Sequence, residues 1–247
     1  MSAIRILYQD EELLVASKPG GLLMHRTGIS RDRVFFMQQL RDQLGGAWVY
    51  PVHRLDRATS GVVAVARSSE AARALQAAMQ ADACEKHYLA FVRGRVPPAW
   101  SVARPLKNER GEPQPALTHF ARLLEVDFGA ERYCSLVRAR LHAGRRHQVR
   151  RHLARDTYFI LGDSAYGKGG INRHFREAFG LPRLCLHACR LQFPHPRDGR
   201  LLVVEDPLPD DLRGFLLRLP GLDEAGLGRA LESAPGVCED AASGGTP

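Results

Sequence analysis

The stretch HRLDRATSGVVAVA, residues 53–66, joins a charged loop to a short apolar run. The apolar part, residues 61–66, has the length and composition of a buried strand. The loop carries Asp56 between Arg54 and Arg57, and loops held against a rigid sheet are where functional side chains concentrate. Neighbouring arginines favour the ionised form of a carboxyl group, so Asp56 is a candidate nucleophile or base. A surface salt-bridge cluster at the start of a strand is the alternative.

Strands and helices are predicted on both sides of this stretch. Period-two segments and turn residues predict strands over residues 3–8, 13–17, 86–95, 118–126, 132–141, 184–193 and 201–205. Helical spacing of apolar residues predicts helices over residues 32–44, 69–79 and 145–155. The proline-rich stretch 97–115 is predicted to be a loop. Hairpin-length turns between most strands favour an α+β domain around a mainly antiparallel mixed sheet with flanking helices.

The composition is that of an ordinary globular protein, with 247 residues of which 45% are hydrophobic and 25% charged. We find no apolar stretch of about 18 residues and no secretory signal, so we expect a cytoplasmic protein without a membrane partner. The five cysteines form no CxxC pair. Cys185, His187 and Cys189 share one face of a predicted strand, and without a second ligand pair they favour structural burial over a metal site.

Positive charge is concentrated between residues 131 and 200, a stretch that contains fifteen Lys or Arg and five Asp or Glu. An arginine-rich surplus of this kind suits the phosphate backbone of a nucleic acid, although solubility alone is the other explanation. Within this stretch, the predicted helix 145–155 would bury Val149 and Leu153 and place Arg146 and Arg150 on another stripe.

The charged loop resembles the catalytic motif of RluA-type pseudouridine synthases, in which the aspartate is the essential nucleophile. The resemblance covers roughly residues 4 to 205, and the start of the chain is similar to the family members that act on uridine 65 of tRNA. A departure is Ala143, where the family more often has threonine. Further motifs follow in the family's order: KPGG at 18–21, KHY at 86–88, GRRHQVR at 144–150, GDSAYG at 162–167, LHA at 186–188 and FPHP at 193–196.

The resemblance implies a role for each matching residue around a central RNA-binding cleft. Asp56 would be the nucleophile, Tyr88 would stack on the flipped uracil, and Arg150 would hold Asp56 ionised. Arg54 would fill the gap left by the flipped nucleotide, and Leu186 would form an apolar wall. The remaining implied substrate and RNA contacts are His53, Arg57, Lys86, Arg145, Arg146 and Arg151.

The implied activity is isomerisation of a specific uridine to pseudouridine, most closely uridine 65 of tRNA, by a monomer that uses neither cofactor nor metal. An rRNA-directed enzyme of the same family is one alternative. A non-catalytic RNA-binding or chaperone module is another, and a nuclease or glycosylase using Asp56 with His53 or His147 is a third. We expect the catalytic domain to span residues 1–220, followed by an acidic, disordered tail over 221–247.

Overall fold

The fold is built on twelve strands and six helices in the part of the chain that the computed structural model describes, residues 3–26, 32–130 and 132–232. The strands are β1 (Arg5–Gln9), β2 (Leu13–Lys18), β3 (Tyr50–Pro51), β4 (Ser60–Ala66), β5 (Glu85–Arg93), β6 (Ala99–Val102), β7 (Leu106–Lys107), β8 (Pro113–Gln114), β9 (Thr118–Asp127), β10 (Tyr133–Leu141), β11 (Leu186–Pro194) and β12 (Leu201–Glu205). The helices are α1 (Phe36–Gln43), α2 (Ser69–Ala78), α3 (Gln148–Arg155), α4 (Gly169–Phe179), α5 (Asp210–Leu216) and α6 (Glu224–Glu232).

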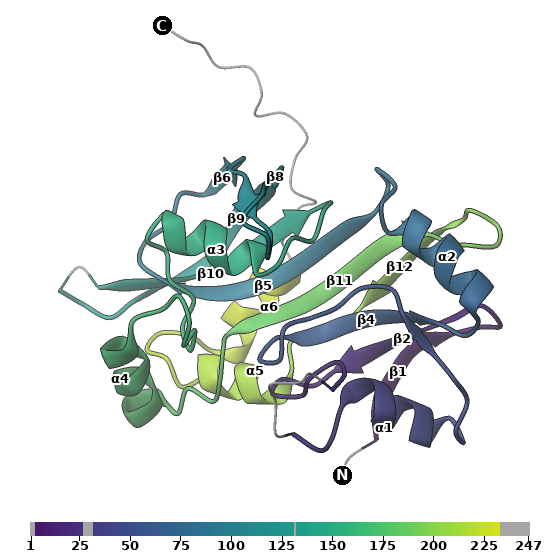
Figure 1. The fold of residues 1–247 in the computed structure, drawn as a ribbon. Coiled ribbons are helices and arrows are strands. Elements are labelled where there is room, and N and C mark those ends of the chain that lie inside the picture. The colour runs from purple at the N-terminus through teal and green to yellow at the C-terminus, as the bar shows by residue number, and fades with distance from the viewer. Residues whose placement is uncertain (1–2, 27–31, 131, 233–247) are drawn as a thin grey trace, which may run out of the picture.

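A ten-stranded sheet runs through the molecule in the order β1-β2-β4-β11-β5-β10-β9-β6, with β12 paired to β11 and β3 paired to β4 (Figure 1). Among the described strands, β4 and β11 run parallel, and their neighbours in the sheet pair antiparallel. The predicted α+β class with a mainly antiparallel mixed sheet is therefore confirmed.

The parallel pair brings two distant parts of the chain together. His187 lies opposite Ser60, and Ala188 lies opposite Gly61. Gly61 has a φ of +122°, and a Cβ atom at this position would lie 2.1 Å from the carbonyl oxygen of Ala188. Only glycine permits so close an approach of two backbones. Because parallel strands start at the same edge of a sheet, the loop that precedes β4 lies beside the start of β11.

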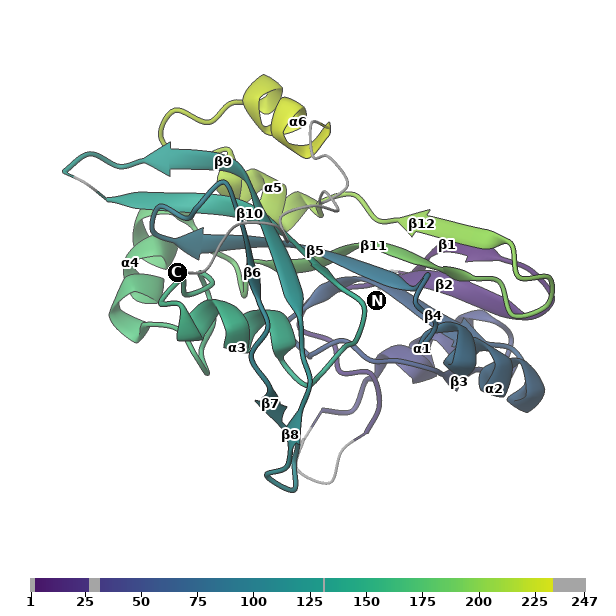
Figure 2. The ribbon, with the colours of Figure 1, turned by 90° about the horizontal axis from the view of Figure 1, so that it is seen from above.

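Helices cover the sheet on both of its faces. In the N-terminal half, successive side chains of β2 point to opposite faces of the sheet. Leu14 packs in the apolar cluster that contains α1, and Leu13 packs in the cluster that contains α2. In the C-terminal half, Phe91 of β5 meets Phe215 of α5 edge to face, with ring centroids 6.2 Å apart. Helices α5 and α6 lie on the opposite side of the sheet from α3 (Figure 2). The face of β5 that carries Tyr88 is thus left for α3 and the charged loop.

The prediction of a loop over residues 97–115 is wrong. This stretch contains β6, which pairs with β9 at the edge of the sheet, and the small hairpin of β7 and β8. Prolines flank β6 but do not interrupt it, and an edge strand tolerates prolines near its ends because one side needs no hydrogen-bond partner. In Figure 2 the β7–β8 hairpin projects from the sheet near α3.

Two predicted helices begin later than expected. Helix α1 starts at Phe36 instead of residue 32, because Phe35 is extended and bridges to Leu23. Helix α3 starts at Gln148 instead of residue 145, because His147 adopts a left-handed conformation with a φ of 54°. The predicted shared stripe of Arg146 and Arg150 is therefore wrong, since Arg146 precedes the helix.

The chain after Gly221 includes α6, which the sequence did not predict. Leu227 is fully buried in the larger apolar cluster, so the first part of the expected tail packs against the sheet beside β9. Residues 233–247 lie outside the described residues, and the boundary at residue 220 stays a prediction. No helix in the described ranges is long and apolar enough to cross a membrane.

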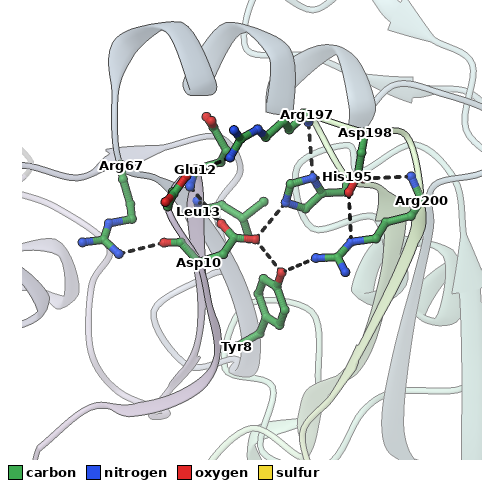
Figure 3. Close-up of polar contacts among 10 residues, drawn as sticks. Tyr8, Asp10, Glu12, Leu13, Arg67, His195, Arg197, Asp198 and Arg200 are labelled. Atoms are coloured by element: carbon green, nitrogen blue, oxygen red, sulfur yellow. Dashed lines mark hydrogen bonds and ion pairs between the residues drawn. The ribbon is translucent and has the colours of Figure 1, made fainter.

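A polar cluster ties the turn after β1 to the turn between β11 and β12 (Figure 3). The Asp10 carboxylate accepts hydrogen bonds from the Tyr8 hydroxyl and from Nε2 of His195, the latter at 2.8 Å. Burial would raise the pKa of Asp10, but the hydrogen bonds from Tyr8, His195 and the backbone of Leu13 outweigh burial and lower that pKa to about 2. His195 is buried, so this cluster joins the two chain segments from the inside.

Candidate active site

A cavity of about 240 Å³ opens where the charged loop, β5, the start of β11 and the N-terminus of α3 converge. The β7–β8 hairpin contributes Lys107 and Gln114 to its wall. Seven of the eleven residues predicted for the site line this cavity: Arg54, Asp56, Tyr88, Arg145, Arg146, Arg150 and Leu186. The structure therefore brings most of the predicted site to one place, including residues that are about 130 positions apart in the chain.

Asp56 presents its carboxylate to the cavity with 22% of its side chain exposed. Its Oδ2 atom accepts a hydrogen bond from Nη1 of Arg150 at 3.0 Å, which is the pairing expected from the sequence. Its Oδ1 atom lies 3.5 Å from Nε2 of His147. The carboxylate is thus held on one side by a permanent cation and remains open to the cavity, as a nucleophile requires.

Arg150 is itself held by a buried carboxylate, Asp163. Nε and Nη2 of Arg150 donate to the two oxygens of Asp163 at 2.8 Å each, and the Asp163 side chain is 1% exposed. Burial opposes the charged form of both groups, but their mutual hydrogen bonds outweigh it, so the pKa of Arg150 is raised and the pKa of Asp163 is lowered. The fork leaves Nη1 pointing at Asp56 and fixes the direction of that contact.

Sequence reasoning gave Asp163 no role. The backbone amides of Ala165 and Tyr166 donate to its Oδ1 atom at 2.9 and 3.0 Å, and Asn172 donates to its carbonyl oxygen. The sequence offered two signals for Asp163: it lies in the motif GDSAYG, and it is one of the few acidic residues in the basic stretch. Its pairing with Arg150 depends on tertiary structure.

His147 lines the cavity and contacts Tyr166, and neither residue had a predicted part in the preferred site. Nδ1 of His147 lies 2.9 Å from the Tyr166 hydroxyl, and the Tyr166 ring lies 5.1 Å from the guanidinium carbon of Arg150. Burial lowers the pKa of His147, although the charge of Asp56 opposes this shift. The lowered pKa favours the neutral ring of His147 at pH 7, and its Nε2 atom lies 3.5 Å from the Asp56 carboxylate.

Tyr88 forms an aromatic wall of the cavity. It lies on β5 between Ala139 of β10 and Ala188 of β11, whose small side chains leave room for its ring. Burial, followed by the nearby charge of Asp56, raises the pKa of Tyr88 well above its ordinary value, so the hydroxyl stays protonated. Apolar side chains complete this part of the wall: Leu55, Leu141, Val149 and Leu186. A planar base would meet both a ring face and aliphatic contacts here.

The rim of the cavity carries arginines. Arg54 is exposed, and its side chain makes no hydrogen bond or ion pair with residues in the described ranges. Arg145 donates from Nε to the carbonyl oxygen of Pro115 at 3.1 Å, while exposed Arg146 reaches Glu109 at 3.4 Å. An exposed ion pair of this length contributes little to stability, so Arg146 can exchange its partner for a phosphate at low cost.

Four predicted residues do not line the cavity. His53 accepts a hydrogen bond from the Ala64 amide at its Nε2 atom, and burial lowers the pKa of His53 to about 3. This neutral ring anchors the charged loop to β4. The other three contact backbone carbonyls: Arg57 that of Gly21, Lys86 that of His142 and Arg151 that of Lys107. RNA contact by these four residues stays a prediction.

Lys18 supports the charged loop from beneath and was assigned no role from the sequence. Its side chain is fully buried, and Nζ donates to the carbonyl oxygens of Pro19, Leu22 and Arg57 at 2.8, 2.7 and 3.2 Å. Burial and the nearby charge of Arg183 lower the pKa of Lys18 to about 7. The lysine thereby ties the KPGG loop to the residue that follows Asp56.

Cys185, which immediately precedes β11, and His187 on β11 are buried, as the sequence favoured, whereas Cys189 is half-buried at a register shift of the strand. His187 is buried, and its ring nitrogens contact Ser60 Oγ at 3.0 Å and the Asp206 carbonyl oxygen at 2.9 Å. Both nitrogens are therefore occupied by protein atoms. Within the described residues, no cluster of three or more His, Cys, Asp or Glu side chains could hold a metal ion.

Comparison with known proteins agrees with this geometry. Residues 12–155 match the family model for RNA pseudouridylate synthase. The tRNA pseudouridine synthase C of Vibrio cholerae is 39% identical, with 86% of this chain and 94% of that protein covered, and that of Pasteurella multocida is 42% identical, with 78% and 86% covered. The structure of human RNA pseudouridylate synthase domain containing 4 has a TM-score of 0.70 at 25% identity and covers 87% of this chain and 92% of its own. The chain belongs to the RNA pseudouridylate synthase family, whose members are isomerases that act on uridine in RNA.

Proposed function

We propose that this protein converts uridine 65 of tRNA to pseudouridine, with Asp56 as the nucleophile. The observation that carries the proposal is the Asp56 carboxylate, held at 3.0 Å by Arg150 in a cavity walled by Tyr88 and Leu186. The choice of tRNA rests on the relatives, which are named tRNA pseudouridine synthase C and resemble this chain over most of its length. We further propose that it acts in the cytoplasm as a monomer.

The reaction rearranges one nucleotide without adding or removing atoms. The bond between C1′ and N1 of the uridine breaks, the uracil turns within the cavity, and a bond forms between C1′ and C5. The hydrogen on C5 leaves as a proton, and N1 gains one. Asp56 can attack C1′, add to C6 or assist a glycal route by removing a proton, and each route needs an ionised carboxylate beside the ribose. Arg150 pairs this carboxylate with a positive charge and fixes its direction.

The remaining cavity residues offset the cost of extruding the base, which is a few kcal/mol. Tyr88 offers a ring face on which the flipped uracil stacks. Arg54, exposed and without a protein partner among the described residues, fills the gap that the base leaves in the RNA. Arg145 and Arg146 at the rim contact phosphates, which position the RNA without reading its sequence.

The test is pseudouridine formation on tRNA that carries uridine tritiated at C5. The wild-type protein should release tritium from tRNA, and carbodiimide mapping should place the product at uridine 65. Asp56→Asn should abolish release while the protein stays folded, because the substitution removes the charge and keeps the shape. Asp198→Asn is the control, since Asp198 lies in the turn cluster of Figure 3 and should leave activity unchanged.

Four outcomes would reject parts of this proposal. Full activity of Asp56→Asn would exclude the aspartate as nucleophile. Loss of a pseudouridine from rRNA instead of tRNA in a deletion strain would favour the rRNA-directed alternative. A deletion phenotype that Asp56→Ala fully restores would indicate a non-catalytic RNA-binding or chaperone module, and cut strands or abasic sites would indicate a nuclease or glycosylase.

A further inference from the structure

Thr59 is a polar residue of the cavity wall that the mechanism above does not use. It follows Asp56 by three positions, and its amide donates to the Asp56 carbonyl oxygen at 3.1 Å, so a tight turn joins the two residues. Thr59 is 2% exposed and lines the cavity. Its hydroxyl oxygen is buried and has no hydrogen-bond partner in the described residues.

An unpaired buried hydroxyl is unfavourable, so its presence beside the Asp56 carboxylate needs an explanation. Two other polar side chains of the cavity, Gln148 and Arg150, are buried to a similar degree and are satisfied by protein atoms. Gln148 uses its amide group on the Arg145 amide and the Leu117 carbonyl, and Arg150 uses its guanidinium on Asp56 and Asp163. Within the described ranges, Thr59 is thus the cavity residue whose buried hydrogen-bonding capacity the protein leaves unused.

We propose that the Thr59 hydroxyl hydrogen bonds with the imide edge of the flipped uracil and holds the base while it turns. This inference rests on the proposed function and adds a substrate-contacting residue to it. The hydroxyl and the methyl group share Cβ, so a rotamer step about the Cα–Cβ bond would turn the hydroxyl from the wall towards the base.

The chemistry of the rotation fits a hydroxyl. Replacing N1 by C5 at C1′ requires a half turn of the uracil about the axis through N3 and C6. That turn exchanges O2 with O4, while the N3–H group stays on the axis. A threonine hydroxyl offers one donor and two acceptor sites and rotates freely. Thr59 can therefore accept from N3–H or donate to the adjacent carbonyl both before and after the turn.

The test compares Thr59→Val with Thr59→Ser. Valine keeps the branched shape and removes the hydroxyl, whereas serine keeps the hydroxyl and removes the methyl group. Three quantities are measured: the single-turnover rate of pseudouridine formation at saturating tRNA, the affinity for tRNA, and the midpoint of thermal unfolding. The affinity serves as an internal reference, because phosphate contacts dominate it.

We expect Thr59→Val to slow the single-turnover step by roughly 5- to 100-fold, the effect of leaving a polar group of the base unpaired in a closed site. Its tRNA affinity should change by less than about twofold, and its unfolding midpoint should stay the same or rise, because the lost hydroxyl had no partner among the described residues of the free protein. Thr59→Ser should keep a rate within about threefold of wild type, since it retains the donor and acceptor.

A wild-type rate in Thr59→Val would overturn the inference. So would slow turnover in both variants together with lower unfolding midpoints, because that result assigns Thr59 to packing. Failure of the proposed function is a separate outcome, seen as wild-type protein that forms no pseudouridine in tRNA. If the wild type modifies rRNA instead, the same two variants are compared on rRNA. If it modifies neither RNA, both proposals fail.

Discussion

Replacement of Asp163 by asparagine tests whether the buried fork behind Arg150 organises the site. Asp163→Asn keeps an acceptor for the amides of Ala165 and Tyr166. It removes the negative charge that pairs with the guanidinium of Arg150, whose side chain is only 9% exposed. Loss of one partner of a buried ion pair costs about 3–5 kcal/mol. The substituted side-chain amide would still accept one hydrogen bond, and Asp56 still offers Arg150 a negative charge, so we expect a loss of about 2–4 kcal/mol in the free energy of unfolding.

For a chain of this size, that loss corresponds to a fall of about 5–15 °C in the midpoint of thermal unfolding. Asp211→Asn is the matched control. Arg183 forks onto Asp211 with the same two donor atoms, at 2.6 and 3.0 Å, but the Asp211 side chain is 43% exposed. Loss of this exposed ion pair in Asp211→Asn should lower the free energy of unfolding by less than about 1 kcal/mol. Urea unfolding followed by circular dichroism would give both differences.

The pH dependence follows from the lowered pKa of Asp163. A carboxyl group whose pKa is lower in the folded state stabilises the fold above its unfolded pKa, near 3.8, and loses that contribution as pH falls through the folded value. The stability of Asp163→Asn should therefore change less than that of wild type below about pH 4. In activity, a displaced Arg150 should slow turnover by about 10- to 100-fold. A stability loss no larger than that of Asp211→Asn would refute this account of the site.

Three further predictions concern the base, the RNA and the turn cluster. Tyr88→Leu should lower the single-turnover rate by about 5- to 100-fold because it removes the stacking face. Tyr88→Phe keeps the ring and should lower this rate much less. Equal reductions of the rate in the two variants would assign the effect to the hydroxyl. Arg146→Ala should weaken tRNA binding and reduce the slope of log affinity against log salt by about one, measured by filter binding; an unchanged slope would show that Arg146 meets no phosphate. Asp10→Asn should lower the free energy of unfolding by about 1 kcal/mol at pH 7, after allowance for solvent screening. The difference from wild type, measured by urea unfolding, should shrink as pH falls from about 4 towards 2. A difference that grows in acid would contradict the lowered pKa of Asp10.

Local patterns predicted much of the fold because alternation and turn residues act between near neighbours in the chain. The strand that carries Tyr88 was predicted over residues 86–95 and observed as Glu85–Arg93. Prediction was poorer where a neighbouring element decides the conformation. Strand β6 exists because β9 offers it an edge, and α3 begins late because His147 turns towards Asp56 and Tyr166.

The sequence by itself determined the position of the charged loop, the family motifs and the arginine-rich stretch of the chain. It also placed Asp56 and Arg150 together, although only through a resemblance, since 94 positions separate them. Tertiary structure alone decided that Asp163 forks Arg150, that His53 anchors the loop behind the site, and that the Thr59 hydroxyl lies in the cavity wall without a partner among the described residues. The physical reason is that burial and ion pairing depend on which segments meet in space. Here the parallel contact of β4 with β11, permitted by Gly61, places the charged loop beside the start of β11.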